Sequence, residues 1–216
     1  MVALDGSHGA PGIRGETART GETLLFALLI AALLAAASLV IGASDGGGWA
    51  LAAEMVSRFS LLVFVAAMAV EPAGRLLRSQ PTIAAARERP SLVLAFVAVS
   101  AVSLLCVAAP SWLGGEPQSL PSVAYCILTA SILAVMLFSA HPGTRRFLGG
   151  PAWRAMQRIA TSYFWLVFAL TGIGRLIGPH RPDYWHGFAL LLLVGVLLFR
   201  FADTFVTHWR VAEKVG

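Results

Sequence analysis

The chain has 216 residues, of which 57% are hydrophobic and only 12% are charged. Soluble domains carry about 25% charged residues, so this composition argues against a soluble protein and predicts an integral membrane protein. The formal net charge of +5 is spread between apolar segments rather than over one polar face, which argues against a nucleic-acid partner.

Six long apolar segments follow a polar, glycine-rich start. Residues 1–22 lack the pattern of a cleaved signal peptide and are predicted to be a flexible cytoplasmic tail. Each segment reaches the roughly 20 residues that a helix needs to cross a bilayer, and none alternates like a barrel strand. We expect an all-α bundle of six transmembrane helices in residues 23–206, then a short cytoplasmic tail at 207–216. The spans are predicted at about 24–43, 57–77, 90–109, 121–140, 159–177 and 184–205.

The arginines between the spans predict the orientation. Most of them lie between the second and third spans and between the fourth and fifth, whereas the segments after the first and third spans hold no lysine or arginine. The positive-inside rule therefore places both termini in the cytoplasm. We expect a multi-pass protein of a bacterial inner membrane, surrounded by lipid.

Charged side chains inside the spans are candidate functional residues, because a charge at membrane depth is costly unless it is paired. Glu71 and Arg75 lie four residues apart near the inner end of the second span, and Arg200 and Asp203 lie three apart in the sixth. Both spacings place the two side chains on one helix face and predict local ion pairs that snorkel to the interface. Arg58 at the outer end of the second span is expected to snorkel too, with a lipid headgroup or a haem propionate as alternative partners.

Histidines and cysteines give weaker signals. His180 and His186 flank a predicted outer loop, where an ordinary interfacial turn is the favoured interpretation and a surface metal or proton site is the alternative. His141 ends the fourth span on the other side of the membrane. Cys106 and Cys126 lie in apolar segments without CxxC or Cys/His metal spacing, so no metal site is expected.

Three stretches share a further pattern. The second span reads SRFSLLVFVAAMAVEPAGRL, the third follows an arginine with PSLVLAFVAVSAVSLL, and FSAHPGTRRFLGGPAWRAMQRIATSYFWLVF leads from the fourth into the fifth. These stretches resemble the ferric reductase-like transmembrane domain family, a six-helix haem-b membrane module. The matching positions are Arg58, Ser60, Pro72, Arg89, Phe96 and the run that begins at Trp153. The likeness covers roughly residues 57–178 and implies the same bundle.

The resemblance implies haem histidines in the third and fifth spans, and the sequence departs from the family there. Val102 and Ser103 stand near the first expected position, and Met156 and Gln157 near the second. Low-spin iron held between two helices needs an imidazole on each, so this chain resembles a degenerate member without the haem site. Gln157 is then expected to cap or hydrogen-bond at the start of the fifth span.

These observations predict a membrane protein of ferric reductase-like fold without haem, acting as a structural or regulatory subunit for another membrane or redox protein. One alternative is a haem-b electron-transfer subunit, an oxidoreductase component, that uses Met156, His141 or His186 as ligands. The other is a small proton-linked transporter that uses Glu71 or Asp203. No flavin or nicotinamide motif is evident, so electron transfer would need separate partners. The oligomeric state stays open.

Overall fold

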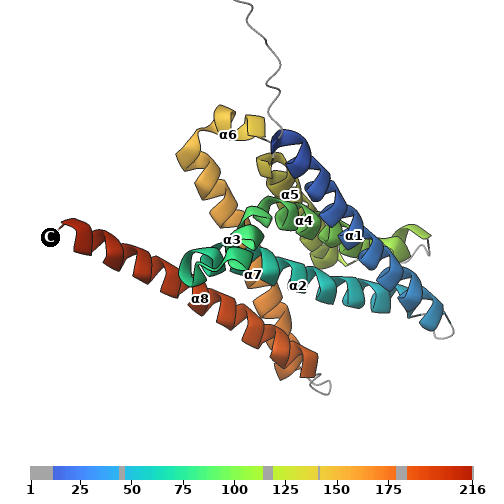
Figure 1. Ribbon diagram of the computed structural model, residues 1–216. Helices are drawn as coiled ribbons and strands as arrows, with labels where there is room; N and C mark the ends of the chain where they lie inside the picture. Colours follow the sequence, from blue (N-terminus) through green and yellow to red (C-terminus); the bar gives the residue numbers. More distant parts are fainter. Residues whose placement is uncertain (1–11, 44–46, 114–118, 141, 179–183, 216) are drawn as a thin grey trace, which may run out of the picture.

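A computed structural model describes residues 12–43, 47–113, 119–140, 142–178 and 184–215, which form helices and no strand (Figure 1). The helices are α1 (Gly12–Ile41), α2 (Gly48–Leu77), α3 (Gln80–Arg87), α4 (Arg89–Leu113), α5 (Leu120–Ala140), α6 (Pro142–Leu148), α7 (Gly150–Ile177) and α8 (Tyr184–Val215). Six of them are long and apolar enough to cross a membrane: α2, α4, α5, α7 and the apolar parts of α1 and α8. The prediction of an all-α, six-span membrane protein is therefore confirmed.

Three helices start earlier than the apolar segments alone predict. α2 begins at Gly48 instead of 57, α7 begins at Gly150 instead of 159, and α1 begins at Gly12, inside the predicted tail. Hydropathy detects only the part of a helix that lipid surrounds, whereas arginine and glutamate are good helix formers that extend the same helix into the polar interface. The early start of α7 puts Arg154 and Arg158 on a helix instead of in a loop.

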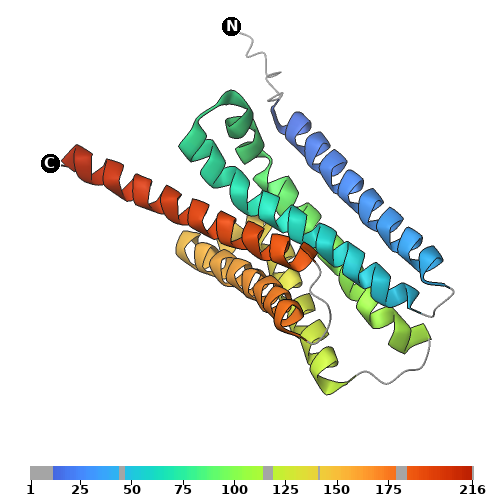
Figure 2. The same cartoon turned by 90° about the horizontal axis from the view of Figure 1, so that it is seen from below.

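Successive spans alternate in direction, so one end of the bundle collects most of the basic residues. The start of α1, the turn from α2 to α3 and the end of α8 all lie at this end (Figure 2). We call it the arginine end, because Arg75, Arg78, Arg87 and Arg89 lie there on α2, α3 and α4 or between them. It is the end that the positive-inside rule assigns to the cytoplasm.

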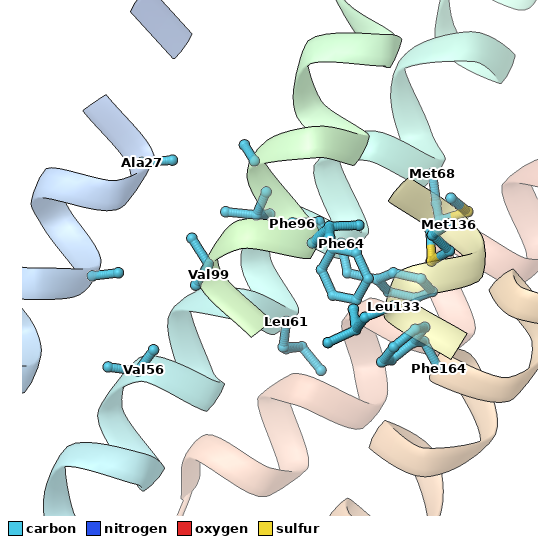
Figure 3. Close-up of a cluster of buried hydrophobic side chains, with 14 of the residues drawn as sticks. Ala27, Val56, Leu61, Phe64, Met68, Phe96, Val99, Leu133, Met136 and Phe164 are labelled. Atoms are coloured by element: carbon cyan, nitrogen blue, oxygen red, sulfur yellow. The ribbon is translucent and has the colours of Figure 1, made fainter. Parts of the chain in front are cut away.

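Aromatic rings fill the centre of the bundle. The phenylalanine cluster consists of Phe64 from α2, Phe96 from α4, and Phe164 and Phe168 from α7. The ring centroids of Phe96 and Phe164 are 4.8 Å apart in an edge-to-face arrangement, and those of Phe64 and Phe96 are 5.2 Å apart. Figure 3 shows Phe64, Phe96 and Phe164 meeting beside Met136 of α5. Four helices therefore pack at this level through van der Waals contact.

Small side chains bring α1 close to its neighbours. Ala27 and Ala31 are buried in the contact of α1 with α2 and α4, and Ala52 is buried on α2. Small residues let helix backbones approach closely, which is the main source of attraction between helices in lipid. Large apolar side chains such as Leu25 and Leu33 point outward from the same helix, as expected for a surface that lipid covers.

Candidate functional site

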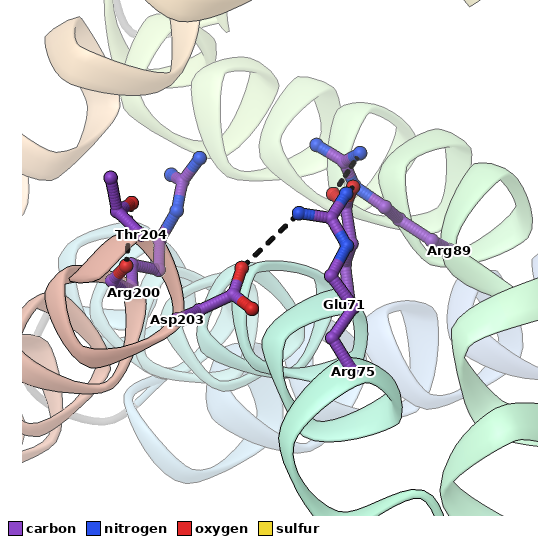
Figure 4. Close-up of polar contacts among 6 residues, drawn as sticks. All are labelled: Glu71, Arg75, Arg89, Arg200, Asp203 and Thr204. Carbon is purple, nitrogen blue, oxygen red and sulfur yellow. Dashed lines mark hydrogen bonds and ion pairs between the residues drawn. The ribbon is translucent and has the colours of Figure 1, made fainter. Parts of the chain in front are cut away.

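An ion-pair network joins three helices at the arginine end. The Glu71 carboxylate of α2 accepts from Arg75 one turn along the same helix and from Arg89 at the start of α4. Arg75 Nη1 also donates to Asp203 Oδ2 of α8 at 3.2 Å (Figure 4). The predicted Glu71–Arg75 pair is confirmed, and it forms the centre of a network that connects α2, α4 and α8.

Asp203 pairs with α2, although its spacing from Arg200 predicted a pair within α8. Asp203 is 7% exposed, and the ion pair to Arg75 compensates the burial of its charge. Arg200 instead points away from Asp203 (Figure 4), and its Nη1 lies 3.4 Å from the sulfur of Met68. Because α2 and α8 run in the same direction, Arg200 lies beside Met68 and Asp203, one turn further along α8, lies beside Arg75. The packing of α8 on α2 therefore determines the partner of each charged residue.

A cavity of about 430 Å³ opens beside this network. We call it the arginine cavity, because Arg89 of α4, Arg154 and Arg158 of α7, and Arg200 of α8 line it together with the single carboxylate of Glu71. Arg154 and Arg158 have no carboxylate within ion-pair distance in the described part of the chain. Four positive groups therefore face one negative group, and the lining favours an anion.

The α7 wall of the arginine cavity is one polar helix face. Arg154, Gln157, Arg158 and Thr161 follow the spacing of zero, three, four and seven residues that places side chains in one stripe. Trp153 anchors the start of this stripe, because its indole Nε1 donates to the Ser139 carbonyl of α5 at 3.0 Å. Sequence analysis missed this site because it assigned the two arginines to a loop. The sequence predicts this polar stripe if the helix is taken to begin at residue 150.

A smaller apolar cavity of about 140 Å³ adjoins the arginine cavity between α2, α7 and α8. Its apolar lining comes from Phe64, Met68, Trp165, Val196 and Leu197. Thr161 and Ser162 of α7 and Arg200 of α8 line both cavities. A basic compartment and an apolar compartment therefore meet along one set of side chains. We call the second one the apolar cavity.

The two positions expected for haem ligands lie at different depths. Phe96 and Phe164 touch at the centre, and α4 and α7 run in the same direction. Ser103 lies seven residues beyond Phe96, whereas Gln157 lies seven residues before Phe164. At 1.5 Å per residue, the two positions are separated by roughly 20 Å along the bundle. They do not fit the two axial positions of one iron.

Both side chains make local contacts instead. Ser103 Oγ donates to the carbonyl of Ala53 on α2 at 3.4 Å, and Gln157 Nε2 donates to Ser139 Oγ on α5 at 3.5 Å. The alternative ligands are equally scattered. Met156 is partly buried near the start of α7, His186 lies at the far end of the bundle, and His141 falls outside the described residues.

A third cavity, of about 290 Å³, lies at the opposite end of the bundle. We call it the opposite cavity. Arg58 Nη2 lies 2.6 Å from Glu54 Oε1, and its guanidinium carbon is 5.5 Å from the centre of the Trp185 ring. These contacts leave the Arg58 side chain 24% exposed, and the predicted snorkelling stays a prediction. His186 also lines this cavity, while His180 lies outside the described residues.

The architecture and the cavities define a polytopic α-helical membrane protein with a basic cavity at one end, whose positive charge the described residues neutralise only in part. No protein-family model, curated protein or solved structure matches the chain. Within the described ranges, no group of three or more His, Cys, Asp or Glu side chains is placed to hold a metal ion.

Proposed function

We propose that the chain is a six-span membrane subunit of ferric reductase-like fold that works without haem, in a structural or regulatory role. The separation of Ser103 and Gln157 carries the part of this proposal that concerns haem. Two helices can hold one iron between them only where their ligands share a depth, and these positions differ by roughly 20 Å. Replacing both residues with histidine would still leave two imidazoles on different levels.

The contacts between helices support a structural role. The phenylalanine cluster packs the level between the two positions with rings from three helices. At the arginine end, the pairs of Glu71 with Arg89 and of Arg75 with Asp203 connect the same bundle through charge. Side chains thus hold the helices together at the centre and at one end, which is what a rigid membrane subunit requires.

The absorption spectrum tests the proposal. Detergent-purified protein is measured oxidised and then dithionite-reduced, with haem quantified against protein. We expect no Soret band and far less than one haem per chain, both for the wild-type protein and for the Ser103→His/Gln157→His double variant. Near-stoichiometric haem in the wild-type protein would overturn the proposal and restore the electron-transfer alternative. Loss of that chromophore in Met156→Ala or His186→Ala would then identify a ligand. Haem gained by the double variant would show that the two positions share a depth after all.

A transporter is the second candidate, because cavities approach the phenylalanine cluster from both ends. A small polar cavity lined by Ser57, Ser60, Ser100 and Ser103 extends the opposite cavity as far as Phe164. From the arginine end, the apolar cavity extends as far as Phe64 of the same cluster. Two vestibules separated by a closed centre are the arrangement that alternating access needs.

Thiol labelling distinguishes the two functions. In a background without Cys106 and Cys126, single cysteines replace Ser103 and Thr161, and a membrane-impermeant reagent is applied to each face of oriented vesicles. A transporter that alternates between two states predicts that Ser103→Cys and Thr161→Cys are each labelled from both faces, because each state opens the centre to a different side. The structural role predicts that each cysteine is labelled only from the face to which its own cavity opens. Proton-linked transport further predicts pH-dependent uptake that Glu71→Gln abolishes.

A further inference from the structure

The arginine cavity carries positive charge that the described protein does not neutralise. Its single carboxylate already accepts from two arginines, one of which lies outside the lining. Arg154 and Arg158 have no carboxylate partner in the described ranges, and Arg200 donates to the sulfur of Met68, which is a weak acceptor. Clustered like charges near the membrane repel one another, so an anion bound between them stabilises this end of the bundle.

The chemistry of the lining favours a phosphate group as this anion. The planar fork of an arginine matches two phosphate oxygens at once, and two arginines on successive turns of α7 face the same space. The Gln157 amide and the hydroxyls of Thr161 and Ser162 add neutral donors to the wall. A phosphate offers several strong acceptor oxygens in different directions, which suits donors that converge from three helices.

The apolar cavity shows what else the ligand carries. It begins where the arginine cavity ends, since Arg200 and the two hydroxyl-bearing residues line both. The rings of Phe64 and Trp165 and the aliphatic side chains of Val196 and Leu197 form the rest of its wall. A free phosphate would leave this second space unfilled, whereas a molecule with an anionic head and a hydrocarbon chain would fill both.

The depth of the site fits a lipid. Arg200 lies six residues before Val206, where the apolar part of α8 ends, and so about 9 Å below that end. Arg89 is the first residue of α4. The site thus extends from the headgroup level into the hydrocarbon. We propose that the two cavities bind one anionic phospholipid, with its phosphate among Arg154, Arg158 and Arg200 and an acyl chain in the apolar cavity. This inference holds whichever function the bundle serves.

Native mass spectrometry of the detergent-solubilised chain tests the site. The protein is titrated with dioleoylphosphatidylglycerol, with dioleoylphosphatidylcholine of the same acyl chains, and with inorganic phosphate. We expect one tightly held phosphatidylglycerol and at least about tenfold weaker phosphatidylcholine, because the choline cation meets the arginines. Arg154→Gln/Arg158→Gln should bind phosphatidylglycerol roughly 30-fold more weakly, at about 1 kcal/mol per arginine. The matched control, Arg78→Gln/Arg87→Gln, removes the same charge from the same end outside the cavity and should change binding less than twofold.

Three results would overturn the proposal. Equal weakening by the two double variants would mean diffuse attraction to the whole end of the bundle. Equal affinity for the two lipids would remove the role of the headgroup charge. Displacement of phosphatidylglycerol by millimolar inorganic phosphate, unaffected by Leu197→Trp, would identify a free-phosphate site. Leu197→Trp fills the apolar cavity from a half-exposed position and should weaken the lipid about tenfold while leaving the arginines in place. It also tests the site if the arginine double variant does not fold.

Discussion

Replacing Phe96 with alanine tests how the bundle is held together. Phe96 is 1% exposed, and its ring lies 4.8 Å from Phe164 and 5.2 Å from Phe64, centre to centre. In a bilayer the unfolded chain keeps this side chain in lipid, so transfer from water contributes little and packing decides the cost. Removing the ring leaves a cavity of roughly 100 Å³, which costs about 2.4 kcal/mol at 24 cal/mol per Å³. The two closest of its three ring pairs, those with Phe164 and Phe64, add about 0.5–1.5 kcal/mol each, for a total of about 3–5 kcal/mol.

Steric trapping in bicelles measures the free energy of unfolding directly. The matched control is Phe138→Ala on α5, because Phe138 is 57% exposed and lipid replaces the ring after the substitution. We expect Phe138→Ala to change stability by less than about 0.5 kcal/mol, and Phe96→Leu to fall between the two alanine variants. Values for Phe96→Ala and Phe138→Ala within 1 kcal/mol of each other would refute the reasoning, since burial in the phenylalanine cluster would then contribute nothing beyond contact with lipid.

Three further substitutions test other contacts, each by the same unfolding measurement. Glu71→Gln leaves two partly exposed arginines without their shared carboxylate and should cost about 1–2 kcal/mol, less in high salt; a salt-independent loss would contradict an electrostatic cause. Gly74→Ala places a Cβ 2.8 Å from the Cβ of Ala86 on α3 and should cost about 1–3 kcal/mol. In the control Gly187→Ala, the added Cβ meets nothing within 4 Å. Equal losses of stability in the two variants would argue against the close approach of α2 and α3 at Gly74. Ser60 and Ser100 share a 2.6 Å hydrogen bond, so a double-mutant cycle should give about 0.6 kcal/mol of coupling, and additive single effects would exclude the bond.

The sequence predicted features that local physics determines. A helix in lipid must satisfy its own backbone hydrogen bonds along a continuous apolar stretch, so six such stretches were enough to count the spans. The Glu71–Arg75 pair was predictable for the same reason, because a spacing of four residues always places two side chains on one helix face. In both cases the partner groups belong to one helix.

Features that depend on contacts between helices were not predictable. Arg75 and Asp203 are 128 residues apart, and no spacing within either helix indicates that they meet. The likeness to ferric reductases gave positions for Ser103 and Gln157 within their own helices, but the relative depth of α4 and α7 follows from how Phe96 packs on Phe164. That likeness itself stays a prediction, because apolar helices share composition for reasons of solvation.

The arginine cavity lies between these two cases. Its α7 wall could have been read from the sequence, since Arg154, Gln157, Arg158 and Thr161 share one face. The hydropathy boundary near 159 concealed it by cutting the stripe in two. That Arg89 and Arg200 complete the cavity depends on the arrangement of α4 and α8 around α7, which no single helix encodes.

The ion pair between Arg75 and Asp203 has a consequence for how the chain is made. α2 and α4 are synthesised before α8. Glu71 and Arg89 can therefore form their ion pair as soon as both helices have entered the membrane. Asp203 emerges only with the sixth span, so during most of translation Arg75 has Glu71 as its sole described carboxylate partner. Insertion of α8 therefore adds a second carboxylate partner for Arg75 and joins α8 to α2. Asp203 is the more buried of the two residues, so α8 depends on a preformed Arg75 for the partner of its own charge, whereas Arg75 already has Glu71.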